Sequence, residues 1–397
     1  TQILTTAGVE EYSQLSFSFQ PEHEQLTLHR LEVLRGDERQ DRLAKAKIEV
    51  IRQEKGIDRQ LYDGELTAHI ILEDIRVGDV VSYAFSLVGD NPVFGGHVHA
   101  FYRVQFATEV DYLRRSILWD PGKRSLNWQM LETEESAVVS EAEGGLKSLV
   151  WLREASPELD TESNTPRWHV DFPWLEVTDY GNWKEFGDWA MRLYGTEEEL
   201  PEELQRVCEK IRAEAASPEE SAVMALRWVQ SNVRYLGSFM GEHTHLPHKL
   251  EDVTRRRFGD CKDKTRMLVA MLKHLGHDAA PALVSSSGRR IVERYLPGYA
   301  CFDHVIVHLQ LDGKSHWLDP TVAFQGGRLG EIYGTDYGFA FVVREGEDAL
   351  TPVEPGGREV DQTVIEEVFE IPGMTGGAEL RVETVMTGGD ADRLRRT

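Results

Sequence analysis

The chain has 397 residues, of which 41% are hydrophobic, and its 68 acidic and 44 basic residues give a formal net charge of −24. A chain of this length is expected to form two or three domains, and its apolar content is ample for packed cores. Because the charge is strongly negative, bulk attraction to nucleic acid or to an anionic membrane is disfavoured. No apolar run in the sequence approaches the roughly 18–20 residues of a membrane-spanning helix.

The first part of the chain, residues 1–165, predicts short strands separated by turns. Alternating polar and apolar residues, or a short apolar run, are typical of such strands. The segments with these patterns are Tyr12–Phe19, Leu26–Leu34, Glu65–Leu72, Val80–Val88, Phe101–Val110 and Tyr112–Trp119. They predict an antiparallel β-sandwich-like domain. The acidic stretch Glu132–Glu143 is interpreted as a solvated loop or hairpin rim rather than a binding patch.

A linker is predicted at residues 153–180, which contain three prolines and no hydrophobic period. Four tryptophans lie in or after it: Trp168, Trp174, Trp183 and Trp189. An aromatic cluster at such a junction favours packing between domains over a ligand platform. Helices follow at Asn182–Tyr194 and Glu202–Ala215, and Ser217-Pro218-Glu219-Glu220 opens a third. Cys208 lies on an apolar helix face and is expected in the core.

A second cysteine, Cys261, directly precedes an amphipathic helix that is predicted to stop at Gly276. Asp260 is a suitable N-cap, which puts Cys261 in the first turn, where free N–H groups and the helix dipole favour an anion. A thiol in this position ionises more easily, and the thiolate is the nucleophile. Basic residues are expected to add positive charge nearby: Arg255, Arg256, Arg257, Lys262 and Lys264. The alternative is a buried structural cysteine.

A strand and a hairpin turn follow downstream. His304 opens an alternating strand, Asp312-Gly313 is a hairpin turn signal, and the partner strand runs to Asp319. Because antiparallel partners across a tight turn are neighbours, Asp319 is expected beside His304. Asp303 is expected to point to the opposite sheet face and so not to replace it. A cysteine, a histidine and an aspartate in this order match a nucleophile, its base and the base's orienting group.

The last part of the chain predicts more strands, at residues 339–343, 364–371 and 379–387. The last two alternate and are joined by a turn that contains proline and glycine. They are expected to begin a further β-rich domain. The sequence ends in what reads as the middle of an element, so we expect the natural chain to continue.

Three motifs together resemble a known family: Gly259-Asp260-Cys261-Lys262-Asp263-Lys264, Phe302-Asp303-His304-Val305 and Trp317-Leu318-Asp319-Pro320-Thr321. They resemble the core of the transglutaminase-like superfamily, most closely in bacterial proteins that carry a DUF3857 domain ahead of it. The N-terminal part matches more loosely, through Val80-Val81-Ser82-Tyr83 and Gly89-Asp90-Asn91-Pro92.

The resemblance implies an α+β fold in three parts. These are an N-terminal β-rich, DUF3857-like domain at residues 1–165, a papain-like cysteine core at 166–330, and a truncated β-rich segment at 331–397. By the same resemblance, an exported location, periplasmic or in the cell envelope, is favoured over the cytoplasm.

The implied function is that of a cysteine hydrolase or acyltransferase acting on a peptide or protein amide. Cys261 would be the nucleophile, His304 the base and Asp319 the orienting group. The N–H of Cys261 is the natural first oxyanion donor. By resemblance the second donor is expected from the segment Asn232–Gly237, with Tyr235 as the candidate, and Asp260 is a further candidate at the substrate. The alternative is a non-catalytic binding or scaffolding module with a degenerate core.

No metal or cofactor is predicted. His243, His245 and His248 form a His-x-His-x-x-His set that Cys261 or Asp260 could complete as a zinc site, but loop histidines are usually solvated. The sequence has no Cys-x-x-Cys, His-Glu-x-x-His, EF-hand or Walker motif.

The remaining groups near the motifs have structural interpretations. Asp263 is expected in a structural ion pair with Lys262, Lys264 or a neighbouring arginine. Three cysteines exclude a complete disulfide framework. Cys301 is read as an apolar filler, or as a partner for Cys261 on oxidation.

Overall fold

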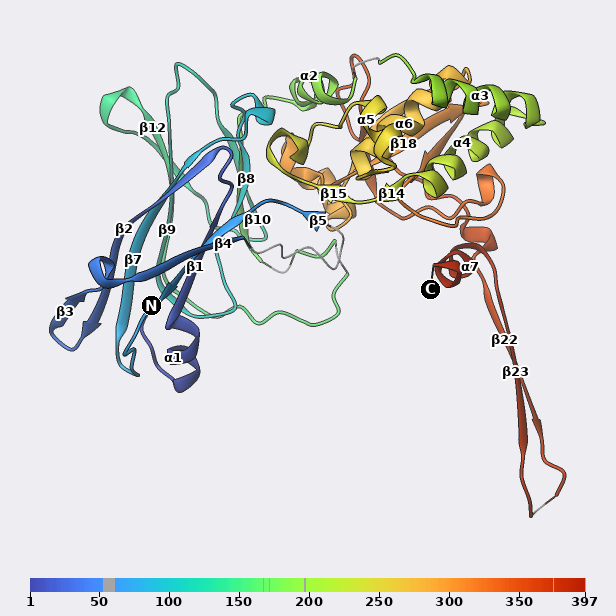
Figure 1. The fold of residues 1–397 in the computed structure, drawn as a ribbon. Helices are drawn as coiled ribbons and strands as arrows, with labels where there is room; N and C mark the ends of the chain where they lie inside the picture. The colour runs from blue at the N-terminus through green and yellow to red at the C-terminus, as the bar shows by residue number, and fades with distance from the viewer. Residues whose placement is uncertain (53–60, 167, 171, 196–197, 374, 397) are drawn as a thin grey trace. The chain divides into compact units, whose positions relative to one another are not determined.

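The computed structural model describes residues 1–397 except 53–60, 167, 171, 196–197, 374 and 397 (Figure 1). The chain divides by compactness into two units. One holds Thr1–Gly96 and Leu236–Leu246, and the other holds His97–Tyr235 and Pro247–Thr397. Helices and strands are mixed, and the first unit is rich in strands, as the α+β prediction requires. In the described part of the chain, no helix has the length and apolarity needed to cross a membrane.

The first unit contains two antiparallel sheets of three strands, ordered β3-β2-β7 and β1-β6-β4. The strands are β1 Gln14–Phe19, β2 Glu24–Arg35, β3 Glu38–Asp41, β4 Lys47–Arg52, β6 Leu66–Ile71 and β7 Val80–Gly89. Their inward side chains form one core that includes Leu31, Val33, Ile70 and Val81. Tyr12, predicted to start a strand, instead ends helix α1 (Thr6–Tyr12). The oxygen of Thr5 accepts from the backbone N–H of Gly8, and this cap favours the helix.

The same unit includes a short segment from much later in the chain. β15 (Gly237–Ser238) pairs in parallel with β5 (Leu61–Tyr62). The side-chain amide of Asn91, in the predicted Gly-Asp-Asn-Pro turn, donates to the carbonyl oxygen of Gly241 at 2.8 Å. The segment that follows Tyr235 is therefore tied to the N-terminal strands.

The second unit begins with two more antiparallel sheets, ordered β10-β13-β8 and β11-β12-β9. The strands are β8 His99–Arg103, β9 Val110–Trp119, β10 Asn127–Leu131, β11 Val138–Glu141, β12 Lys147–Ser156 and β13 Trp174–Thr178. The exposed strand β11 makes the acidic stretch a hairpin rim, as predicted. The single strand predicted at Phe101–Val110 is wrong, because β8 ends at Arg103 and β9 starts at Val110.

The predicted linker at residues 153–180 is also wrong in part, because β13 is the central strand of its sheet. Leu175, Glu176 and Val177 are all buried. The residues Leu175-Glu176-Val177-Thr178 do alternate, but the strand is short and directly follows Pro173, so its signal in the sequence is weak. Of the four tryptophans, Trp183 and Trp189 pack on Phe186 within this unit, while Trp168 is exposed.

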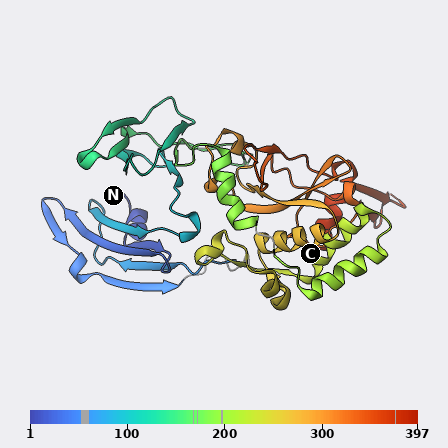
Figure 2. The same ribbon diagram turned by 90° about the horizontal axis from the view of Figure 1, so that it is seen from above.

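The rest of the second unit packs helices against a five-stranded antiparallel sheet, ordered β19-β18-β17-β20-β21. The helices are α2 Trp183–Tyr194, α3 Glu202–Glu214, α4 Pro218–Asn232, α5 Leu250–Arg256 and α6 Cys261–His274. The strands are β17 Asp278–Val284, β18 His304–Leu311, β19 Lys314–Leu318, β20 Phe339–Val342 and β21 Thr351–Pro352. Figure 2 shows α3, α4 and α6, green to yellow, gathered along one side of the orange strands.

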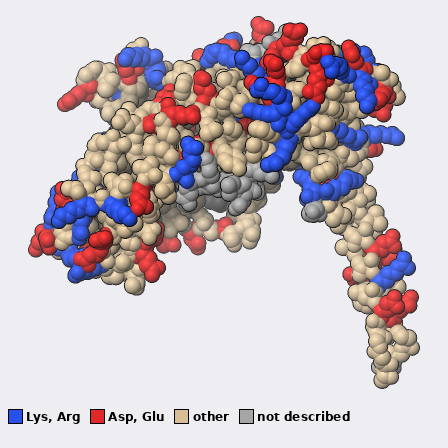
Figure 3. Space-filling model, viewed as in Figure 1, with Lys and Arg blue, Asp and Glu red and all other residues tan. Residues whose placement is uncertain are grey.

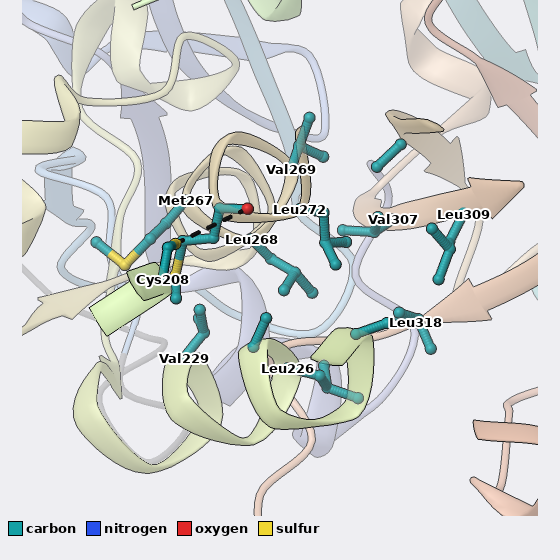
Figure 4. Packing of buried hydrophobic residues seen from close by; sticks show 14 of the residues in the cluster. Cys208, Leu226, Val229, Met267, Leu268, Val269, Leu272, Val307, Leu309 and Leu318 are labelled. Atoms are coloured by element: carbon teal, nitrogen blue, oxygen red, sulfur yellow. Dashed lines mark hydrogen bonds between the residues drawn. The ribbon is translucent and has the colours of Figure 1, made fainter. Parts of the chain in front are cut away.

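The core between these helices and the sheet is apolar (Figure 4). Leu226 and Val229 of α4 and Leu268 and Leu272 of α6 meet Val307 of β18 there. Cys208 is fully buried in this core, and its thiol faces the carbonyl of Met271 at 3.9 Å. The core assignment of Cys208 is confirmed.

The chain ends with β22 (Thr363–Glu370) and β23 (Glu379–Met386), which pair with each other, and helix α7 (Gly388–Arg395). All eight residues of β22 are exposed. Both strands were predicted, whereas the helix α7 that follows them was not.

Candidate active site

The N-terminus of α6 is set by its cap. The Asp260 carboxylate accepts from the backbone N–H of Asp263, and the Asp263 carboxylate accepts from the N–H of Asp260, which makes a reciprocal capping box. Gly259 is required just before it, because a Cβ there would lie 2.7 Å from the Cβ of Asp263. Cys261 is thereby the first residue of α6, as predicted.

The hairpin β18–β19 brings Asp319 to His304. Asp312 and Gly313 both have positive φ, as a type I′ turn requires, and Val307 pairs with Leu318. Nε2 of His304 lies 2.9 Å from Oδ2 of Asp319. Asp303 instead accepts hydrogen bonds from Ser286 and Ser287, so it does not compete for the imidazole.

His304 also contacts Cys261. Helix α6 packs on β18, where the hydroxyl of Thr265 donates to the carbonyl of Val305 at 2.9 Å. Burial tends to lower the pKa of His304, but the charge of Asp319 and hydrogen bonds to Asp319 and Cys261 raise it well above its ordinary value. Because Nε2 of His304 is hydrogen-bonded to Asp319, Nδ1 is the ring nitrogen that can interact with the sulfur of Cys261. His304 therefore lies between Cys261 and Asp319 and is hydrogen-bonded to Asp319.

Asp319 is held from several sides. Its Oδ1 accepts from the backbone N–H of Thr321 at 2.9 Å and from the Thr321 hydroxyl at 2.6 Å. Its Oδ2 accepts from the phenol of Tyr337 at 3.0 Å, and its backbone carbonyl accepts from Gln230 at 3.2 Å. Burial alone would raise the pKa of Asp319, but the contacts with His304 and Thr321 lower it to about 2. The carboxylate is therefore ionised at neutral pH.

Tyr337 and Gln230 were not identified from the sequence. Tyr337 lies beyond the quoted motifs and Gln230 far before them, and neither carries a spacing signal. Thr321 closes the third motif, two residues after Asp319. An aspartate followed two residues later by a hydroxyl is a common local turn, and this pattern offered a signal for Thr321.

Four of the five basic residues predicted near Cys261 form ion pairs with carboxylates. Arg255 pairs with Asp252, Arg256 with Asp263, Arg257 with Glu203, and Lys262 with Asp260. Acidic and basic side chains both lie on the face shown in Figure 3. These ion pairs reduce the positive charge that Arg255, Arg256, Arg257 and Lys262 can present to the thiol.

Lys264 is the exception among these cations. It is buried one turn after Cys261, and its ammonium donates to the carbonyl of Val233 at 2.5 Å. Burial lowers the pKa of Lys264 to about 8, against the charge of Asp319, which raises it. This bond ties α6 to the chain just before Tyr235.

The two other candidate site residues have different surroundings. Tyr235 lies on β14 (Arg234–Tyr235), which pairs in parallel with β16 (Phe258–Gly259). Burial, and then the charges of Cys261, Asp260 and Asp319, raise the pKa of the Tyr235 hydroxyl.

Asp260 is fully buried, and its two oxygens face the N–H of Asp263 and the ammonium of Lys262. Its observed contacts are those of a helix cap. They do not leave it open to a substrate.

The sulfur of Cys261 is largely covered, since this residue is 5% exposed. A cavity of about 680 Å³ lies elsewhere in the second unit, lined by residues that include Tyr194, Leu250, Arg266 and Pro281. None of its lining residues belongs to the row Cys261–His304–Asp319. Of the three histidines considered for a metal site, His248 bonds to the Asp263 carboxylate at 3.1 Å. Asp263 is thus in the predicted structural ion pair, with Arg256 and His248.

One set of three possible metal ligands occurs in the described part of the chain, namely His99, Glu176 and Cys301, and all three are buried. The backbone N–H of Ala300 donates to Nδ1 of His99 at 3.0 Å, so the ring proton lies on Nε2 and is given to Glu176 at 3.0 Å. A metal-binding histidine needs a free lone pair and usually donates from its other nitrogen. Cys301 meanwhile faces the carbonyl of Leu296 at 3.3 Å. This arrangement fits a hydrogen-bonded cluster and does not fit a metal.

Comparison with known proteins identifies two regions of the chain. Residues 205–319 match the family described as the transglutaminase-like superfamily, and residues 1–159 match a domain of unknown function with a solved structure, DUF3857. None of the curated proteins matches the chain.

Among solved structures, a protein from Parabacteroides distasonis that is provisionally described as a protease is 15% identical with a TM-score of 0.70. The match covers 94% of this chain and 73% of that one, and at this identity it shows the fold alone. The periplasmic domain of TgpA from Pseudomonas aeruginosa, bound to ethylmercury, is 12% identical with a TM-score of 0.25, over 74% of this chain and 89% of that one.

Proposed function

We propose that this chain, whose residues 205–319 match the transglutaminase-like superfamily, is a cysteine-dependent hydrolase or acyltransferase that attacks a peptide or protein amide. The observation that carries this proposal is the hydrogen bond between His304 and Asp319, with Cys261 beside His304 at the start of α6. A nucleophile, a base and a group that orients the base are the parts that covalent amide cleavage needs. An exported location remains a prediction that rests on resemblance.

In the proposed reaction, Nδ1 of His304 takes the proton of the Cys261 thiol, and the thiolate attacks the amide carbon. The imidazolium, stabilised by ionised Asp319, then protonates the leaving nitrogen as the carbon–nitrogen bond breaks. The acyl group is now held as a thioester on Cys261. Water or an amine attacks it and gives its proton to His304, which returns that proton to the departing sulfur. Hydrolysis and transamidation differ only in this second nucleophile.

The negative oxygen formed in each attack needs donors. The backbone N–H of Cys261 is free of a helical partner at its position in the first turn and is the proposed first donor. The phenol of Tyr235 is the proposed second donor. Its raised pKa supports this role, because the hydroxyl keeps its proton through the pH range in which a thiolate enzyme works.

A second candidate function is binding without turnover, and the burial of Cys261 favours it. A groove that binds peptides has no need of a reactive sulfur. The two functions therefore differ in the reactivity of one atom.

The deciding experiment is alkylation with iodoacetamide as a function of pH, with mass spectrometry to locate the label. Cys208 and Cys301 are internal controls, since they are 0% and 3% exposed and burial raises the pKa of both thiols. We expect iodoacetamide to label Cys261 faster than Cys208 and Cys301 across the pH range tested. The Cys261→Ala variant should lose that label together with ammonia release from amide substrates. A folded parent chain whose Cys261 reacts no faster than Cys208 would contradict the enzymatic proposal and leave the binding module.

A further inference from the structure

The two oxygens of the Asp319 carboxylate have different partners. Oδ1 accepts from the backbone N–H and the hydroxyl of Thr321, at 2.9 and 2.6 Å, within one local turn. Oδ2 accepts from Nε2 of His304 at 2.9 Å and from the hydroxyl of Tyr337 at 3.0 Å. The oxygen that orients the imidazole is therefore shared with a phenol from a separate segment of the chain, just before β20.

Tyr337 is fixed in this position by packing. It is 6% exposed and belongs to an apolar cluster that includes Ile306 of β18 and Trp317 of β19. Its ring lies 5.8 Å from the ring of His304 at an angle of 44°. Burial, and then the charge of Asp319 and the hydrogen bond to it, raise the pKa of the Tyr337 hydroxyl. Its hydroxyl thus remains a donor, and a carboxylate can only accept from it.

We propose that Tyr337 is a positioning residue for the Cys261–His304–Asp319 row: its hydroxyl fixes the Asp319 carboxylate and takes up part of the charge that would otherwise act on His304. Two donors on one carboxylate oxygen share its electron density, so the presence of one weakens the pull on the other. The device makes His304 a weaker base than Asp319 alone would make it, and so a better proton donor to the leaving nitrogen. The catalytic role of Tyr337 rests on the proposed function, whereas its hydrogen bond to Asp319 is independent of that function.

The test removes only the hydroxyl, in Tyr337→Phe. The matched control is Tyr180→Phe, because the Tyr180 hydroxyl is also buried and has no hydrogen-bond partner in the described part of the chain. Two readouts are used, the NMR titration of the His304 imidazole and the pH profile of Cys261 alkylation by iodoacetamide. We expect Tyr337→Phe to move the His304 titration upward by about 0.5–1 pH unit, the size of one hydrogen bond. The Tyr180→Phe variant should leave both profiles in place.

Replacement of Tyr337 by 3-fluorotyrosine keeps the ring and its packing but makes the phenol a stronger donor. It should move the His304 titration downward, and it covers the case in which Tyr337→Phe does not fold. An unchanged His304 titration in these folded variants, with or without a loss of stability, would overturn the positioning role. If instead the titration shifts but Cys261 is inert even in the parent chain, the proposed function fails while the effect of Tyr337 on His304 stands.

Discussion

Two hairpins of this protein have the same local design and different surroundings. In β18–β19 a tight turn joins two alternating strands, and the residues at positions 305–309 are all buried against helices or neighbouring strands. In β22–β23 the pairing runs just as regularly from Thr363–Met386 to Glu370–Glu379, yet all eight residues of β22 are exposed. Alternation therefore specifies a strand and its register, whereas the partners that cover it come from elsewhere in the fold.

The difference in burial determines which of the two hairpins can hold a catalytic site. Burial lets β18–β19 hold His304 and Asp319 with low-dielectric neighbours that strengthen their contact. The carboxylates of Glu366, Glu370, Glu379 and Glu383 on β22–β23 are solvated and exposed. Substitutions in matched positions of the two hairpins can test this account.

The largest effect is expected from Asp319→Asn. The amide keeps the shape of the carboxylate but cannot stabilise the imidazolium, and it favours the wrong tautomer of His304, so turnover should fall by about 10³–10⁴-fold. Glu367→Gln makes the same chemical change on β22 and should leave turnover unaltered. Amide hydrolysis and amine incorporation, measured at a fixed pH for both variants, provide the comparison. Equal activity of Asp319→Asn and the parent chain would remove Asp319 from the mechanism.

The same elements show how much of the fold could be predicted from the sequence. The cap at Asp260, the turn at Asp312-Gly313 and the alternation after His304 are local signals, and each predicted its element correctly. The contact between His304 and Asp319 followed from the hairpin, because register across a tight turn is short-range information. These parts of the fold are determined by residues that are close together in the sequence.

The parts that were missed depend on residues far apart in the chain. Tyr337 reaches Asp319 from 18 residues away, and no pattern in the sequence marks that approach. The carboxylate that pairs with Arg257, Glu203, lies 54 residues away and could be assigned only when the helices had been placed in space. Strand β13 was read as a linker because it is short and follows Pro173, and its pairing with β8 and β10 becomes visible only in the fold. Tertiary contacts, rather than local propensity, decided each of these cases.

The next effect in size concerns stability. Leu309 of β18 is fully buried, and Leu309→Ala should lower the free energy of unfolding by about 2–5 kcal/mol, through lost burial and the cavity left behind. Ile365 of β22 is 60% exposed, so Ile365→Ala should change stability by less than about 0.5 kcal/mol. Denaturant unfolding of both variants gives the two values. A large loss in Ile365→Ala would show that the exposed ribbon is covered in solution, for example by another copy of the chain.

The smallest expected effect is a pH dependence of the stability that Asp319 and His304 contribute in the buried hairpin. Asp319 has a pKa lowered to about 2, so its contribution is present above the ordinary aspartate value of 3.8 and is lost as the pH falls toward 2. His304 has a raised pKa, so its contribution is present below the ordinary value of 6.5 and is lost as the pH rises through its raised value. Stability of the parent chain minus that of Asp319→Asn should therefore be largest, about 2 kcal/mol, between roughly pH 4 and 6.5, and should shrink on both sides. Unfolding measured from pH 2 to 9 checks this, and a difference that does not vary with pH would mean that Asp319 and His304 are not paired as ions in the folded protein.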